Sequence, residues 1–200
     1  MNSRAEKCAG KPAVFLDRDG TLIEDARYLA HADQIRLLDG SLEALRLARS
    51  AGLATVLVTN QSAIGRAWLS ESELHEIHTR LSALLESGGA RLDGIYFCPH
   101  HPEAVLDEYR RVCPCRKPNP GMLLRAAEDL ELDLANSLMV GDRLRDVEAG
   151  RRAGCRTVLV ETGYGLEEWR ARRPTDPQPD HIAPNLLQAV RWFLELGDTD

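Results

Sequence analysis

An apolar run followed at once by two acids, Ala13-Val14-Phe15-Leu16-Asp17-Arg18-Asp19-Gly20-Thr21, stands near the start of the chain. The run is typical of a strand buried on both faces, so the acids lie where that strand would reach solvent. Two carboxylates at such a strand end can jointly hold a divalent cation, and one can act as a nucleophile while the other transfers a proton. The alternative is a polar turn in which Gly20 takes a positive φ and both acids are solvated.

Short aliphatic runs alternate with amphipathic segments along the rest of the chain. Buried strands are predicted at Val14–Asp17, Ala54–Thr59, Gly94–Phe97, Leu138–Asp142 and Thr157–Val160. Helices are predicted over Ser41–Ser50, after the capping box of Ser70 and Glu73, after Asn119-Pro120, over Arg143–Ala153 and over Asn185–Leu196. This alternation predicts an α/β fold with a Rossmann-like, doubly wound parallel sheet, which binds ligands beyond the carboxyl ends of its strands.

The composition fits one soluble domain. The chain has 200 residues, 44% of them hydrophobic, and its 31 acidic against 25 basic residues give a net charge of −6, which weighs against a nucleic-acid partner. Residues 1–7 lead into no signal-peptide core, and no apolar stretch approaches the ~18 residues of a membrane span. We therefore expect a cytoplasmic monomer with a small-molecule substrate and no membrane partner. Residues 1–12 are expected to form a disordered tail and residues 13–200 a single domain.

Three further polar groups stand at predicted strand ends or helix starts. Thr59-Asn60 ends the second strand and offers a hydroxyl, an amide and main-chain N–H groups to phosphate oxygens. Arg116-Lys117 precedes a helix and could neutralise a phosphoryl group as it transfers. Asp142 could join a cation site, and Asp146 could hold a lysine or a loop. Taken singly, each group has an ordinary explanation as a turn, a solvated pair or a capped helix start.

Cysteines gather in two short arms, Cys98-Pro99-His100 and Cys113-Pro114-Cys115. Three thiols and one imidazole suit a closed, tetrahedral, structural Zn²⁺ site in a loop of about residues 98–115, with His101 competing with His100 as the fourth ligand. The alternative is that Cys98 and Cys115 are small core residues and His100 is a surface residue. A disulfide framework is the weaker explanation, since the chain has an odd number of cysteines, five, and is expected in a reducing compartment.

Together these motifs resemble the haloacid-dehalogenase superfamily of phosphatases. The matching segments, in order, are Asp17-Arg18-Asp19-Gly20-Thr21, Thr59-Asn60, Lys117, and Gly141-Asp142 with Asp146. The resemblance covers almost the whole chain and implies the haloacid-dehalogenase fold. Only roughly 30 residues lie between Thr21 and the second strand, too few for a cap domain, so we expect a capless, open site.

The zinc arms narrow the resemblance to the zinc-containing, capless heptose-bisphosphate phosphatases. The sequence is similar to theirs in Thr59-Asn60-Gln61-Ser62, in Asp93-Gly94-Ile95-Tyr96-Phe97-Cys98-Pro99-His100-His101-Pro102, and in Cys113-Pro114-Cys115-Arg116-Lys117-Pro118-Asn119-Pro120-Gly121-Met122. This resemblance implies hydrolysis of the C7 phosphate of a heptose bisphosphate, in the biosynthesis of nucleotide-activated heptose.

The resemblance also implies a role for each matching residue. Asp17 would be the nucleophile, and Asp19 would protonate the leaving oxygen and then activate water. Mg²⁺ would be held by the Asp17 side chain, the Asp19 main-chain carbonyl and Asp142. Residues implied to bind the phosphoryl oxygens are Thr59, Asn60 and Lys117. Residues implied to face the second phosphate or to support the site are Arg116, Arg66, Asp146 and Arg143.

Some positions depart from the family pattern. The loop after the second strand has Ala63, Gly65 and Ala67 where glycine, alanine and glycine are usual, and Arg143 and Arg145 replace what is often a lysine and an acid. These changes spare the chemistry and leave the sugar and anomer preference open.

Three other functions stay open at this point. Histidinol-phosphate phosphatases resemble this family in fold, in chemistry and in a similar zinc loop. A non-enzymatic phosphate- or zinc-binding module would keep the fold but would have no need of Asp19. A phosphoacceptor signalling domain also carries an aspartate at a strand end, although neither Asp19 nor the zinc arms fit it.

Overall fold

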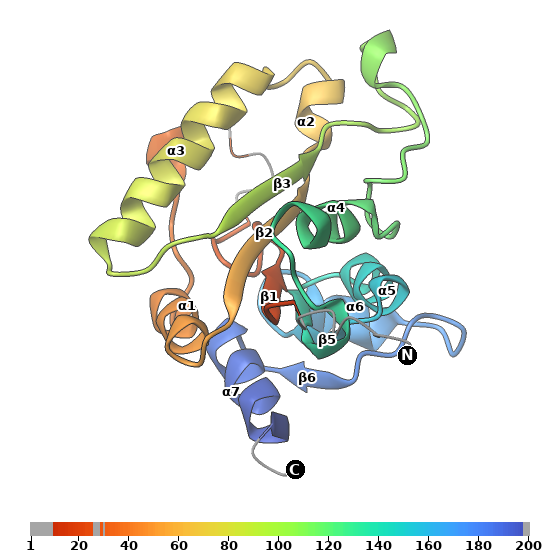
Figure 1. The fold of residues 1–200 in the computed structure, drawn as a ribbon. Helices are drawn as coiled ribbons and strands as arrows, with labels where there is room; N and C mark the ends of the chain where they lie inside the picture. The colour runs from red at the N-terminus through yellow and green to blue at the C-terminus, as the bar shows by residue number, and fades with distance from the viewer. Residues whose placement is uncertain (1–9, 26–28, 30, 198–200) are drawn as a thin grey trace, which may run out of the picture.

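The computed structural model describes residues 10–25, 29 and 31–197. Six parallel strands form one sheet in the order β3-β2-β1-β4-β5-β6 (Figure 1). They are β1 (Ala13–Leu16), β2 (Ala54–Asn60), β3 (Gly94–Cys98), β4 (Leu138–Gly141), β5 (Arg156–Val160) and β6 (His181–Ala183). The predicted doubly wound α/β architecture is confirmed. β6 was not predicted, because it is three residues long and only Ala183 is fully buried, which leaves almost no pattern to read.

Helices connect the strands in the described part of the chain. They are α1 (Ser41–Ser50), α2 (Ser62–Gly65), α3 (Glu71–Ser87), α4 (Gly121–Asp129), α5 (Leu144–Ala153), α6 (Gly165–Ala171) and α7 (Leu186–Gly197). The capping box before α3 is confirmed, since the Ser70 hydroxyl accepts from Glu73 N at 3.2 Å and Glu73 Oε2 accepts from Ser70 N at 2.7 Å. Across the described ranges, none of the helices has the length and apolar character needed to cross a membrane.

Two apolar cores lie on opposite faces of the sheet. Side chains of α1, α3 and α7 pack on one face against residues such as Leu16, Leu57 and Val140. On the other face α4 and α5 pack against Phe15 and Val56. Figure 1 shows the two helical layers on either side of the strands. Removing each such side chain from water stabilises the fold by about 1.5–3 kcal/mol, which explains why the strands read as continuous apolar runs.

The strand order positions the site. β1 pairs with β2 and with β4, and the chain winds from β1 toward β3 on one side and from β4 toward β6 on the other. The switch point therefore lies between β1 and β4, where a crevice forms beyond the carboxyl ends of the strands. Asp17 and Asp142 follow these two strands directly. Between β1 and β2 the described residues form a 3-10 turn (Ala32–Gln34) and α1 but no separate domain, consistent with a capless site.

The predicted N-terminal tail is wrong for residues 10–12. Lys11 N donates to Glu131 O at 3.0 Å, and Lys11 O accepts from Asp133 N at 3.0 Å. Pro12 O accepts from Ala54 N at 2.9 Å. These main-chain bonds attach residues 10–12 to the rest of the domain. Because no side chain takes part in them, the sequence pattern could not predict them. Residues 1–9, the rest of the predicted tail, lie outside the described residues.

Candidate active site

A buried lysine links two carboxylates at the centre of the site. Lys117 Nζ lies 3.0 Å from Asp17 Oδ1 and 2.8 Å from Asp146 Oδ1, and it donates to Val58 O at 2.8 Å. Burial alone would lower the pKa of Lys117, but the carboxylates of Asp146 and Asp17 outweigh it and raise the pKa. Burial likewise opposes ionisation of Asp17, yet Lys117 and the more distant Arg145 hold its pKa below the ordinary value. Asp17 is therefore an anionic nucleophile candidate beside a fixed cation.

A third carboxylate, Asp142, completes the acidic centre. The residue is 1% exposed, and one carboxylate oxygen from each of Asp17, Asp142 and Asp146 lies within 4.8 Å of the others. Burial, with the nearby charges of Asp17 and Asp146, raises the pKa of Asp142 to about 8. A divalent cation would relieve this repulsion, and clustered carboxylate oxygens are the ligands that Mg²⁺ prefers. The acidic centre therefore fits the predicted Mg²⁺ site.

The Asp142 side chain leaves no room for a Cβ at Gly20. Its φ is +77°, and a Cβ at this position would lie 2.4 Å from Asp142 Oδ2. The glycine therefore serves both the turn and the close approach of the backbone to a buried carboxylate. The positive φ of Gly20 agrees with the polar-turn alternative, but Asp17 is 6% exposed and therefore not solvated as that alternative required.

Asn60, the last residue of β2, bonds the main chain of Lys117. The Asn60 side chain donates from Nδ2 to Lys117 O at 3.0 Å and accepts from Lys117 N at its Oδ1 at 3.1 Å. The amide is thus engaged by the main chain of Lys117, whereas the sequence predicted a bond to a phosphoryl oxygen. The Thr59 hydroxyl accepts from Gln61 Nε2 at 2.9 Å and faces the same cavity as Asp17.

An open cavity of about 480 Å³ lies over these groups. Its lining includes the predicted residues Asp17, Asp19, Thr59, Asn60, Asp142 and Arg143. Residues in the lining that were not predicted as site residues include Arg18, Gln61, Arg145 and Tyr164. A cavity of about 740 Å³ beside it, along α5, shares Arg145 but lacks Asp17 and Asp142, so we place the chemistry in the smaller one.

Arg143 lies beside the acidic centre. Its main-chain N donates to Asp146 Oδ2 at 3.0 Å, and its guanidinium lies 3.4 Å from the centre of the Tyr164 ring. The same guanidinium bonds Glu168 at 3.2 Å and lies 3.9 Å from Asp142 Oδ2. It therefore adds positive charge beside the acids from a fixed position.

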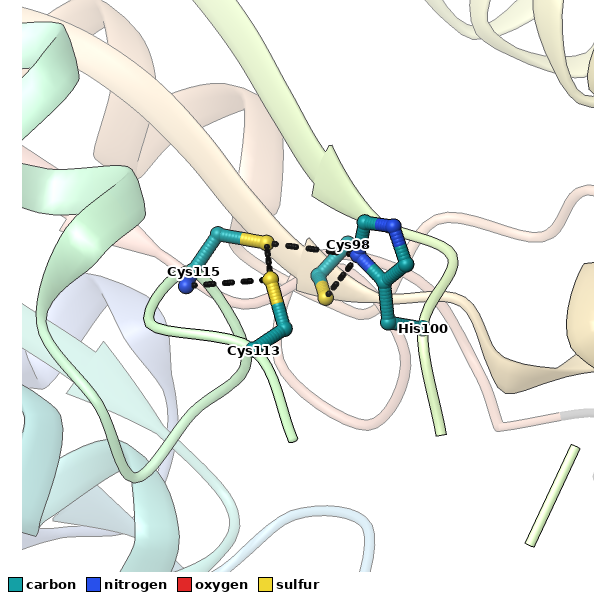
Figure 2. Close-up of side chains that lie close together, drawn as sticks. All are labelled: Cys98, His100, Cys113 and Cys115. Atoms are coloured by element: carbon teal, nitrogen blue, oxygen red, sulfur yellow. Dashed lines mark hydrogen bonds between the residues drawn. The ribbon is translucent and has the colours of Figure 1, made fainter. Parts of the chain in front are cut away.

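The predicted zinc ligands converge in space. Figure 2 shows the side chains of Cys98, His100, Cys113 and Cys115 pointing toward one another. His100 Nδ1 lies 3.6 Å from Cys98 Sγ and 3.7 Å from Cys115 Sγ, and the sulfurs of Cys113 and Cys115 are 2.7 Å apart. His101 instead accepts from Glu103 N at 3.0 Å. The structure thus brings His100 rather than His101 into a cluster whose donor set suits Zn²⁺.

The two cysteine arms, Cys98-Pro99-His100 and Cys113-Pro114-Cys115, also bond the residues that follow the second arm. Arg116 Nη1 donates to His100 O at 3.0 Å, and Asn119 Nδ2 donates to Cys113 O at 3.0 Å. Neither Arg116 nor Arg66 lines the 480 Å³ cavity. Burial and the charges of Arg145 and Arg66 lower the pKa of Arg116, so these three cations are close enough to repel one another. They form a basic rim beside the acidic centre.

Comparisons with known proteins agree with this geometry. A family model described as HAD-hydrolase-like matches residues 114–189. The chain is 41% identical over 180 residues to D-glycero-beta-D-manno-heptose-1,7-bisphosphate 7-phosphatase of Escherichia coli (strain K12), which is 90% of each chain. It is 42% identical over 187 residues to D-glycero-D-manno-heptose-1,7-bisphosphate 7-phosphatase of Thermosynechococcus vestitus, covering 92% of this chain and 95% of that one.

A solved structure extends the agreement to three dimensions. The crystal structure of D,D-heptose 1,7-bisphosphate phosphatase from B. bronchiseptica, complexed with magnesium and phosphate, superposes with a TM-score of 0.82 at 33% identity. The match covers 92% of this chain and 99% of that chain. The chain belongs to the haloacid-dehalogenase-like phosphatases, in the family of the D-glycero-D-manno-heptose-1,7-bisphosphate 7-phosphatases.

Proposed function

We propose that this protein is a Mg²⁺-dependent phosphatase that hydrolyses the C7 phosphate of D-glycero-D-manno-heptose 1,7-bisphosphate to heptose 1-phosphate. The observation that carries the chemistry is the 3.0 Å contact between the buried Lys117 Nζ and Asp17 Oδ1, since Asp17 lines the open cavity. A buried ammonium keeps the carboxylate ionised and aligned for attack. The names of the relatives support the substrate.

The reaction runs in two displacements. An Asp17 carboxylate oxygen forms a bond to the C7 phosphorus while the bond from phosphorus to the sugar oxygen breaks, and Asp19 gives that oxygen its proton. Asp19 then takes a proton from water, whose oxygen attacks the aspartyl-phosphate and releases inorganic phosphate. This second step regenerates the Asp17 carboxylate and the Asp19 acid, so the protons balance.

The residues suited to hold Mg²⁺ are the side chains of Asp17 and Asp142, with the Asp19 main-chain carbonyl as the third protein ligand. The pKa of about 8 for Asp142 supports this fit, because carboxylates crowded without enough positive charge favour a bound cation. When bound, Mg²⁺ supplies positive charge that offsets the growing negative charge on the phosphoryl oxygens. Thr59 and Lys117 offer the hydroxyl and the ammonium for the same oxygens.

The basic rim suits the second phosphate. Arg116 is held by the His100 carbonyl, and Arg66 and Arg145 lie near enough to lower its pKa. A phosphate at C1 would reduce this mutual repulsion, and its binding energy could orient the reacting end of the sugar. We assign Zn²⁺ a structural role, because three cysteines and a histidine fill a tetrahedral shell and leave no open position.

Phosphate release in the presence of Mg²⁺ tests the proposal. Heptose 1,7-bisphosphate, as both anomers, and histidinol phosphate are assayed side by side, with Asp17→Asn as the inactive control. The expected result is a kcat/KM for one heptose anomer that exceeds the value for histidinol phosphate by at least about 100-fold. ³¹P NMR of the product should show the phosphate retained at C1. A preference for histidinol phosphate would overturn the substrate, and no release from either would overturn the activity.

A further inference from the structure

Arg18, the residue between Asp17 and Asp19, is buried and donates hydrogen bonds to the Asp19 carboxylate. Its side chain is 2% exposed. Nε and Nη2 lie 3.2 Å from Asp19 Oδ1, and Nη2 lies 3.0 Å from Asp19 Oδ2. The planar guanidinium thus meets both carboxylate oxygens, a geometry that fixes direction as well as distance.

His78 fixes the other end of the guanidinium. Arg18 Nη1 lies 3.3 Å from His78 Nε2, on α3, sixty positions along the chain. Because a guanidinium can only donate, His78 Nε2 must accept, which places the imidazole proton on Nδ1. Burial and the Arg18 charge lower the pKa of His78 to about 3, so the ring is a neutral acceptor at ordinary pH. Its ring centre lies 6.0 Å from that of Phe97, which packs against it.

Asp19 is held from a second direction by Gln61, the residue that follows β2. Gln61 Nε2 donates to Asp19 Oδ2 at 3.2 Å and to the Thr59 hydroxyl at 2.9 Å. The Asp19 side chain keeps 26% exposure, so it faces the cavity while four contacts fix its plane. A carboxyl group that must give its proton to a leaving oxygen and then, as the carboxylate, take a proton from water depends on this alignment.

We propose that Arg18 and His78 are positioning residues that set the orientation of the Asp19 carboxylate for both proton transfers. The inference rests on the proposed function, in which Asp19 is the acid and base. His78 does not line the cavity and its side chain bonds Arg18, so we expect its effect on turnover to pass through Arg18. Losing this alignment should lower kcat and leave KM nearly unchanged, because ground-state binding of the phosphates uses other groups.

Substitution of His78 tests the inference most directly. His78→Leu removes the acceptor and should lower kcat by about tenfold or more with KM within about threefold of wild type. His78→Gln keeps an acceptor oxygen on a side chain of similar reach and should restore kcat to within about threefold of wild type. His75→Leu is the matched control: His75 lies on the same helix and also contacts Phe97, but it is exposed and bonds Glu71 O. It should leave kcat unchanged.

A double-mutant cycle separates positioning from general damage. If His78 acts through Arg18, then Arg18→Met with His78→Leu should be no slower than Arg18→Met alone. Multiplied losses in the double variant, or wild-type kcat in His78→Leu, would overturn the proposal. Thermal unfolding of each variant identifies any that fails to fold, and Arg18→Lys then replaces Arg18→Met in the cycle.

The same variants should be compared on heptose bisphosphate and on a small aryl phosphate. If wild type proves to prefer another phosphomonoester, the proposed substrate fails, yet the ratios between variants on the aryl phosphate still test the role of Arg18 and His78.

Discussion

The side-chain amide of Asn60 pairs with the main chain of Lys117 in both directions, at 3.0 Å and 3.1 Å. These two bonds join the end of β2 to Lys117, the second residue after Cys115. Asn60 thereby fixes the backbone from which the Lys117 ammonium reaches Asp17 and Asp146. The position of the lysine therefore depends both on β2 and on the loop of residues 98–115.

Replacing Asn60 should lower activity through Lys117. Asn60→Ala leaves the N–H and C=O of Lys117 without their partner, so we expect kcat to fall by about tenfold or more and stability to fall by about 1–3 kcal/mol. Steady-state kinetics and denaturant unfolding measure the two effects. Asn136→Ala is the control, because Asn136 is exposed and its side chain bonds Asp133, far from Lys117 in sequence. Wild-type kcat in Asn60→Ala would contradict this role.

Asp17→Asn should abolish turnover while the protein stays folded. Lys117 keeps its 2.8 Å ion pair with Asp146, so the buried ammonium is not left unpaired. We expect kcat to fall by at least about a thousandfold and the thermal midpoint to stay close to wild type. Activity retained at a tenth of wild type would remove Asp17 as the nucleophile.

The sequence located the candidate catalytic residues better than it located the side chains that hold them in place. Apolar runs mark the strand ends after which Asp17 and Asp142 stand, and a helix pattern begins shortly after Lys117. The local pattern therefore locates all three residues. The partners Asn60 with Lys117 and Arg18 with His78 are 57 and 60 positions apart. Helical periodicity places His78 on the buried face of α3 with Leu74 and Ile77, but nothing local identifies the charged group it meets.

Zinc removal should weaken both the fold and the reaction. Because the cluster orders a loop that leads directly to Arg116 and Lys117, Cys113→Ser should lose bound zinc, lower the thermal midpoint and reduce kcat by about tenfold or more. Metal analysis of the purified protein measures the first effect. Cys155→Ala is the matched control: Cys155 is buried apart from the cluster, burial raises its pKa to about 12, and its loss should leave the zinc content intact. A wild-type protein without zinc would refute the assignment.

Arg116→Ala should discriminate between substrates. We expect kcat/KM to fall at least about tenfold further on the bisphosphate than on a small monophosphate, because only the bisphosphate has a second anion for the basic rim. The bond from Arg116 to His100 O is lost with either substrate, so the ratio of the two losses isolates the contact with the second phosphate. Equal losses on both substrates would assign Arg116 to the loop alone.

His78 should make the stability of the protein sensitive to acid. Its pKa is about 3 in the folded protein against an ordinary value of 6.5, so folding favours the neutral ring. The corresponding stability is fully present above pH 6.5 and is lost as the pH falls toward 3, at about 1.4 kcal/mol per pH unit. His78→Gln has no proton to bind and should lack this component. Urea unfolding at pH 7, 5.5 and 4.5 should therefore show the stability of wild type falling relative to His78→Gln as the pH drops. A constant difference between the two proteins would mean that the ring of His78 is not held neutral by its burial beside Arg18.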